Sequence, residues 1–209
     1  MPSPSLPRQA FYAKRIHDFN DAQRLATNAS GTQLGGFPET APFVGIADAG
    51  VGPEGSGPIG WQTFQPEAQL WLYKYYGDLS TLHESFNATH AFVRMLAAAG
   101  PVEHGLGDWM PVDATSTAFT GLGFQRMAFL AFANISRLVG APDLASMYAA
   151  KAGAIATELN ALFFDAQVLS CDLHISRDLP RAASSTRASS RTERHLPHQG
   201  CRPGAVVSR

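Results

Sequence analysis

Apolar side chains recur at intervals of three and four residues in five segments of the chain, and this spacing predicts five α-helices. The segment 116–139 is apolar on nearly every side, which is typical of a helix buried among others. No segment shows the alternation of apolar and polar residues that predicts a half-buried strand. The expected helices cover residues 10–26, 64–76, 79–99, 116–139 and 142–164. Short links between several of them indicate helical hairpins, so the expected fold class is all-α.

Glycine, proline and aspartate mark the expected ends of these helices. Gly77 breaks the second helix, and Asp78 is expected to cap the third, because aspartate accepts hydrogen bonds from the free amides of a first helical turn. Gly100 with Pro101 is expected to end the third helix. Pro66 is expected in the first turn of the second helix, where proline is tolerated.

A long segment, residues 35–61, interrupts the helical pattern and is too rich in glycine and proline for a regular helix or central strand. It also holds large apolar side chains such as Phe37 and Phe43, which favour burial over disorder. Long irregular segments inside a compact domain are usually functional. A second glycine-rich segment, residues 102–116, follows the third expected helix. These two loops are the expected location of the functional site.

The two loops combine acidic residues with tryptophan, a pairing that suits sugar chemistry. Glycoside hydrolysis uses one carboxylic acid to protonate the leaving oxygen and a second carboxylate to activate water or attack the sugar. Tryptophan faces stack on sugar rings, and an acid pressed against tryptophan is desolvated, which raises its pKa. A simpler interpretation stays open for each acid, as a turn-forming or loop-tip residue. The candidates are Glu39, Asp48, Glu54 and Trp61 in the first loop and Asp108 and Trp109 in the second.

Composition excludes several other classes of function. The formal net charge is −1, so no general attraction to nucleic acid is expected. No run of residues approaches the ~18 apolar positions of a membrane span, and the N-terminus lacks the apolar core of a signal peptide, so cytoplasmic location is the default expectation. The histidines show no metal-ligand spacing and no phosphate-binding glycine motif occurs, so neither a metal nor a cofactor is expected. Oligomeric state stays open.

The two ends of the chain differ in composition from the helical part. Residues 1–9 are rich in proline and serine and are expected to be disordered. Residues 171–209 contain seven arginines and no lysine, with little periodicity and few large apolar residues. This tail is expected to be disordered, and either binds an acidic partner or has no evolved structure; the composition favours the second interpretation. The organised domain is therefore expected over residues 10–165.

Several motifs in this order resemble a known family. The run GFPETAPFVGIADAG, then SGPIGW, then the helix ending in LYKYYGD, and later GLGDW, are together similar to the catalytic domain of bacterial-type α-L-rhamnosidases. These are glycoside hydrolases of the six-hairpin, (α/α)6-barrel class. The resemblance covers roughly residues 10–165 and implies inverting hydrolysis of terminal α-L-rhamnosides, with a rhamnose-containing glycoside or polysaccharide as partner.

The resemblance also implies roles for the loop residues. The family's general acid lies in the loop that ends in Gly-Trp, here Gly60-Trp61, and this chain lacks the usual polar and acidic run before it. We therefore expect Asp48 as the first candidate for the acid and Glu39 as the second. Asp108 and Trp109 match the family's Gly-Asp-Trp motif, which implies contact with the sugar. Trp61 and Glu54 complete the expected substrate contacts.

A complete six-hairpin barrel has twelve helices, whereas this chain supplies about five, so the expected fold is a partial (α/α)6 toroid. In the family the catalytic base lies in the second half of the barrel, on a loop with no counterpart here. The chain is thus expected to be inactive alone. Two alternatives stay open: another (α/α)6 glycosidase, such as a glucosidase, trehalase or glucuronyl hydrolase, and a non-catalytic carbohydrate-binding helical protein.

Overall fold

The computed structural model of the chain describes residues 7–25, 35–38, 40–41, 58–102, 115–165 and 170–171. The chain divides into two units, Met1–Ser176 and Arg177–Arg209, and every described residue belongs to the first. Of the segments predicted to be disordered, residues 7–9 are helical and Cys171 lies in a short strand, so the prediction was wrong there; residues 1–6 and 172–209 lie outside the described residues. The described part is built from five helices and one very short hairpin, so the all-α prediction is confirmed.

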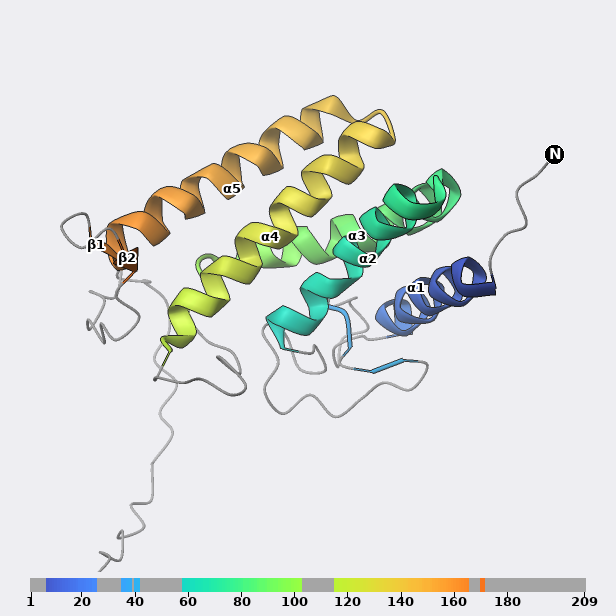
Figure 1. Ribbon diagram of the computed structural model, residues 1–209, viewed down its shortest axis with the longest axis horizontal. Helices are drawn as coiled ribbons and strands as arrows, with labels where there is room; N and C mark the ends of the chain where they lie inside the picture. Colours follow the sequence, from blue (N-terminus) through green and yellow to red (C-terminus); the bar gives the residue numbers. More distant parts are fainter. Residues whose placement is uncertain are drawn as a thin grey trace, which may run out of the picture. The chain divides into compact units, whose positions relative to one another are not determined.

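Two parallel helices, α2 and α4, lie side by side, and the others pack around them (Figure 1). Each of the two is followed by a short link and a helix that returns in the opposite direction, α3 after α2 and α5 after α4. The first helix, α1, packs against α2 and α3. The helices are α1 (Pro7–Leu25), α2 (Ile59–Tyr76), α3 (Leu79–Ala99), α4 (Thr117–Leu138) and α5 (Pro142–Phe163).

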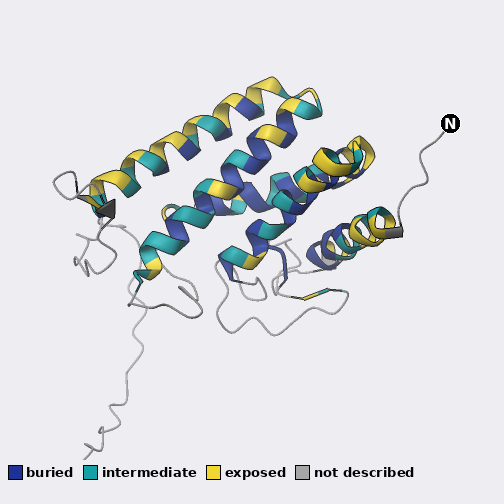
Figure 2. Ribbon diagram, in the orientation of Figure 1, coloured by how far each residue is buried: buried dark blue, intermediate teal, exposed yellow. Residues whose placement is uncertain are grey.

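The main apolar core is organised around α4, which packs against α2, α3 and α5. Figure 2 shows buried residues along α2 and α4, whereas one side of α5 is exposed. Phe132 of α4 is fully buried, and its ring lies 5.0 Å from that of Tyr148 on α5 and 5.2 Å from that of Phe86 on α3. The prediction that the fourth helix is buried on most sides is confirmed, because apolar side chains around α4 contact three neighbouring helices.

Helix α2 begins at Ile59, five residues before the predicted start. Pro66 therefore lies inside the helix rather than in its first turn, and the prediction for it was wrong. An interior proline costs a helix ~3 kcal/mol, because it removes one backbone hydrogen bond and crowds the preceding turn. Ile59 and Gln62 are buried in the extra turn, so tertiary packing outweighs that local penalty.

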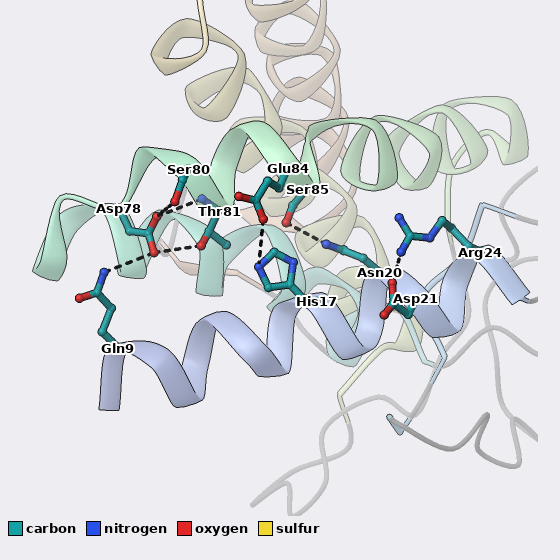
Figure 3. Close-up of polar contacts among 10 residues, drawn as sticks. All are labelled: Gln9, His17, Asn20, Asp21, Arg24, Asp78, Ser80, Thr81, Glu84 and Ser85. Carbon is teal, nitrogen blue, oxygen red and sulfur yellow. Dashed lines mark hydrogen bonds and ion pairs between the residues drawn. The ribbon is translucent and has the colours of Figure 1, made fainter. Parts of the chain in front are cut away.

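Helix α1 is buried along part of its length. Ile16 and Phe19 are buried, whereas Phe11 is 65% exposed. Polar side chains of α1 also contact α3 and its N-cap residue (Figure 3). Asn20 donates to the Ser85 hydroxyl at 2.8 Å, and Gln9 donates to the carboxylate of Asp78 at 3.4 Å.

The link between α2 and α3 has the structure that the sequence predicts. Gly77 adopts the left-handed conformation, with φ of 68°, and its amide donates to the carbonyl oxygen of Tyr73 at 2.8 Å. Asp78 then caps α3, accepting from the Thr81 amide at 3.0 Å and from the Thr81 and Ser80 hydroxyls at 2.9 Å each. The predicted helix cap is confirmed.

A short antiparallel hairpin follows α5 and was not predicted. Strand β1 (Phe164–Asp165) pairs with β2 (Ser170–Cys171), with Phe164 opposite Cys171. Strands of two residues are too short to leave an alternating pattern in the sequence. Among the described helices, none has the length and apolar character needed to cross a lipid bilayer.

Candidate functional site

The segments that contain the predicted site residues precede α2 and α4 in the sequence. Both helices start at the same end of the unit (Figure 1), and each is preceded by one of the two glycine-rich segments. Of the predicted site residues, Trp61 is described. Glu39, Asp48, Glu54, Asp108 and Trp109 lie outside the described residues. The structure therefore defines the two segments at their ends, 35–38 with 58–62 for the first and 100–102 with 115–117 for the second.

Trp61 lies in the first turn of α2, not in the loop that precedes it. Its side chain is 47% exposed, so about half of the residue's surface is not covered by packing. Its neighbour Gly60 approaches the ring of Phe124 on α4 so closely that an added Cβ would lie 3.0 Å from a ring atom. The absence of a side chain at Gly60 thus allows α2 and α4 to pack closely beside the exposed tryptophan.

The first segment is fixed at its start by two glutamines. Gln23 of α1 donates to the carbonyl oxygen of Gly35 at 2.7 Å and to that of Ala88 on α3 at 3.0 Å. The side-chain oxygen of Gln62, next to Trp61, accepts from the amide of Phe37 at 3.0 Å. Phe37 itself is fully buried. The segment that contains Glu39, Asp48 and Glu54 therefore starts after Phe37, whose amide is hydrogen-bonded to Gln62, the neighbour of Trp61.

The second segment is fixed in the same way by Gln125 of α4. Its amide nitrogen donates to the carbonyl oxygens of Leu96 at 3.1 Å and Gly100 at 2.7 Å, at the end of α3. Its side-chain oxygen accepts from the amide of Val102 at 3.1 Å. One side chain thus pairs three backbone groups at the point from which the chain continues toward Asp108 and Trp109.

Glu67 is an acid of unusual electrostatics that the sequence interpretation missed. It lies on α2 six residues after Trp61, which is ~9 Å along the helix axis. Burial raises the pKa of its carboxyl above the usual value, because desolvation disfavours the charged form. The signal was present in the sequence, since Glu67 stands three residues after Phe64 and four before Trp71, on one helical face.

His90 is a packing residue in this structure. Its ring stacks on Phe132 at 5.2 Å between ring centres, and it meets Tyr148 edge-on at 6.0 Å. Burial, and secondarily the charge of Arg94, lower the pKa of His90. Within the described ranges, no group of three histidine, cysteine or acidic side chains could hold a metal ion.

Comparison with known proteins connects these features to a family. A family model described as the bacterial alpha-L-rhamnosidase 6 hairpin glycosidase domain matches residues 6–197. Comparison with curated protein sequences finds no match.

Two solved structures share the fold of the described part. The α-L-rhamnosidase from Dictyoglumus thermophilum matches with a TM-score of 0.59 and 21% identity, over 78% of this chain and 18% of that one. The Streptomyces avermitilis α-L-rhamnosidase, complexed with L-rhamnose, matches with a TM-score of 0.58 and 24% identity, over 75% of this chain and 14% of that one. The chain thus spans less than a fifth of either structure. The expected partial six-hairpin fold is confirmed.

Proposed function

We propose, since this chain belongs to the bacterial α-L-rhamnosidase six-hairpin glycosidase domain family, that it forms the part of a glycosidase that binds a terminal α-L-rhamnosyl residue. The family match over residues 6–197 is the observation that carries this proposal. The Streptomyces avermitilis neighbour, which is described with L-rhamnose bound, supports the choice of sugar. The proposed partner is a rhamnose-containing glycoside or polysaccharide.

The proposed reaction is hydrolysis with inversion at the anomeric carbon. A carboxylic acid protonates the glycosidic oxygen as its bond to the sugar breaks, while a carboxylate removes a proton from the water that attacks the opposite face. Asp48 is our first candidate for the acid and Glu39 the second. The proposed sugar contacts are Trp61, Glu54, Asp108 and Trp109.

The described part of the first segment supports this assignment. Because the amide of Phe37 is hydrogen-bonded to Gln62, the residues between them form a closed loop that starts and ends beside Trp61. Glu39, Asp48 and Glu54 all belong to that loop. An exposed tryptophan next to a loop with three acids provides a stacking face and a proton donor from one stretch of chain.

The catalytic groups that these five helices do not supply belong, in this proposal, to further parts of a glycosidase. Residues 10–165 form the partial glycosidase domain, which the start of α1 at Pro7 extends by three residues. An inverting site holds its two carboxyl groups ~6.5–9.5 Å apart. We place the catalytic base in helical hairpins beyond the five described helices, so this chain alone binds sugar without measurable turnover.

The test is a titration of the 209-residue chain with L-rhamnose, followed by tryptophan fluorescence, with L-fucose as a stereochemical control. We expect a saturable change with L-rhamnose, lost in Trp61→Ala, and little response to L-fucose. Asp48→Asn should still bind, because a proton donor is not needed for binding. No response to L-rhamnose would refute the proposal.

A panel of nitrophenyl glycosides separates the alternatives. The panel is applied to the protein completed with the catalytic-base hairpins, and release of nitrophenol from glucosides or glucuronides, but not from rhamnosides, would assign the chain to another (α/α)6 glycosidase. Binding of L-rhamnose together with absence of turnover, even after the missing hairpins are supplied, would identify a non-catalytic sugar-binding protein.

A further inference from the structure

Three buried glutamines on three helices bond to backbone groups outside their own helix. Their exposed fractions are 4% for Gln23, 0% for Gln62 and 2% for Gln125. A buried amide costs free energy unless its hydrogen bonds are made, and an apolar side chain of the same size would avoid that cost. The bonds that these side chains make therefore explain why an amide occupies each position.

Gln125 acts as a cap supplied from outside the helix. The last carbonyl groups of a helix have no partners within it, and at the end of α3 the Gln125 amide nitrogen pairs two carbonyl oxygens, those of Leu96 and Gly100. The same side chain accepts from the Val102 amide at 3.1 Å. The direction in which the chain leaves α3 is thus set by a residue of α4.

Gln23 and Gln62 fix the other segment from two sides. Gln23 links Gly35 to α3 through its bonds to the carbonyl oxygens of Gly35 and Ala88. Gln62 accepts from the amide of Phe37, whose ring lies 5.3 Å from that of Phe92 on α3. Residues 35–38 are therefore held to α1, α2 and α3 at once.

Burial of glutamine on α2 does not by itself produce this arrangement. Gln69, two turns after Gln62, is also fully buried, yet it donates to the Thr89 hydroxyl at 2.9 Å and so joins two helix side chains. The Gln69 side-chain oxygen also accepts from the same Thr89 hydroxyl, at 3.2 Å, so both of these bonds lie between α2 and α3. Gln69 is consequently a control for Gln23 and Gln125, with the same side chain and similar burial but bonds to a helix side chain.

We propose that Gln23, Gln62 and Gln125 are positioning residues of the sugar site, and that the two segments bearing the candidate acids are held independently of each other. This inference rests on the proposed function. Gln23 and Gln62 set the start of the segment with Glu39, Asp48 and Glu54, and Gln125 sets the start of the segment with Asp108 and Trp109. Among the described residues, the bonds of Gln23 to Gly35 and Ala88 share no residue with the bonds of Gln125 to Leu96, Gly100 and Val102.

The experiment compares Gln125→Met, Gln23→Met and the control Gln69→Met in the 209-residue chain. Methionine keeps the length of the side chain and removes its hydrogen bonds. Amide hydrogen exchange is measured across residues 35–57 and 100–114, and the dissociation constant for L-rhamnose is measured by fluorescence. In Gln125→Met we expect exchange on the order of tenfold faster in 100–114 alone, and in Gln23→Met the same effect in 35–57 alone.

The sugar measurement separates positioning from general stability. We expect the dissociation constant for L-rhamnose to rise on the order of tenfold in Gln125→Met and Gln23→Met, and to change less than about twofold in Gln69→Met. Equal weakening in all three variants would overturn the inference, as would faster exchange in both segments from one substitution. If Gln125→Met does not fold, Gln125→Asn keeps the amide but shortens its reach, and the same segment-specific result is required of it.

The two possible failures are distinguishable. Absence of L-rhamnose binding in the unsubstituted chain refutes the proposed function, and the exchange pattern then decides the positioning inference alone. Normal sugar binding in Gln125→Met and Gln23→Met refutes the positioning inference and leaves the proposed function standing.

Discussion

Replacing Gly35 by alanine should cost more stability than the same replacement at any exposed glycine turn. Gly35 has a φ of +80°, a conformation that residues with a side chain rarely adopt. A Cβ atom there would lie 2.9 Å from the carbonyl oxygen of Ala91 and 3.3 Å from the Cβ of Met95, both on α3. Neither atom can move without distorting the helix, so the overlap has to be relieved by displacement of segment 35–38.

Two terms add to the expected loss. The positive φ costs an alanine about 1–2 kcal/mol. Forcing an extra methyl group into a packed contact typically costs another ~1–3 kcal/mol. The predicted loss for Gly35→Ala is therefore about 2–5 kcal/mol. Gly77 supplies the control, because its φ of +68° is similar but no atom lies within 4 Å of the added Cβ. Gly77→Ala should lose only about 1–2 kcal/mol.

The assay is urea unfolding of the 209-residue chain, followed by circular dichroism at 222 nm and by tryptophan fluorescence. Both substitutions create the same side chain at a similar φ. The difference between their losses of unfolding free energy therefore measures the cost of the close approach of Gly35 to α3. A difference smaller than about 0.5 kcal/mol, within the usual error of additive comparisons, would show that segment 35–38 does not pack on α3 as described.

Three further outcomes are expected. Asp78→Ala should lose about 1 kcal/mol of helix-cap stabilisation at neutral pH. Burial alone would raise the pKa of Asp78, but its hydrogen bonds outweigh this and lower it, so its contribution should be lost as the pH falls through the folded-state pKa; the pH dependence of urea midpoints measures this, and an unchanged loss at acid pH would contradict it. Burial and Arg94 lower the pKa of His90 below its ordinary value of 6.5. Neutral His90 therefore stabilises the fold at pH values above 6.5, and this stability is lost as the pH falls below 6.5; an NMR titration giving a pKa above 6.5 would refute the assignment. Trp71→Glu with Tyr75→Glu should reduce concentration-dependent association, because these aromatic side chains of α2 are 48% and 69% exposed; sedimentation that is unchanged by the substitutions would exclude this surface.

The helices were predictable because each one carries its own local pattern. In α3 the buried positions Leu82, Phe92, Val93 and Leu96 recur at helical intervals, and Asp78 and Gly100 mark its ends. The start of α2 was not predictable in this way. Pro66 is a strong local signal for a first turn, and it was overridden by burial of Ile59 and Gln62, which depends on residues far away in the sequence.

The site was predictable only as two loops. Motif order indicated the family, and the acids and tryptophans indicated sugar chemistry, but the residues that define the loop ends are glutamines on helices. Nothing local in the sequence shows that the amide of Gln23 reaches Gly35 and Ala88. A hydrogen bond between residues 65 positions apart depends on tertiary structure, and helical periodicity carries no information about it.

The links between the helices are unequal at the two ends of the unit, and this has a consequence for how such a domain can change. At one end, Gly77 with Asp78 and residues 139–141 join consecutive helices tightly. At the other end, longer links join α1 to α2 and α3 to α4. Closing a longer loop costs little, ~0.6 kcal/mol for each doubling of its length. Changes of length in these two links should therefore cost little stability, so the proposed site can vary while the helical framework stays constant.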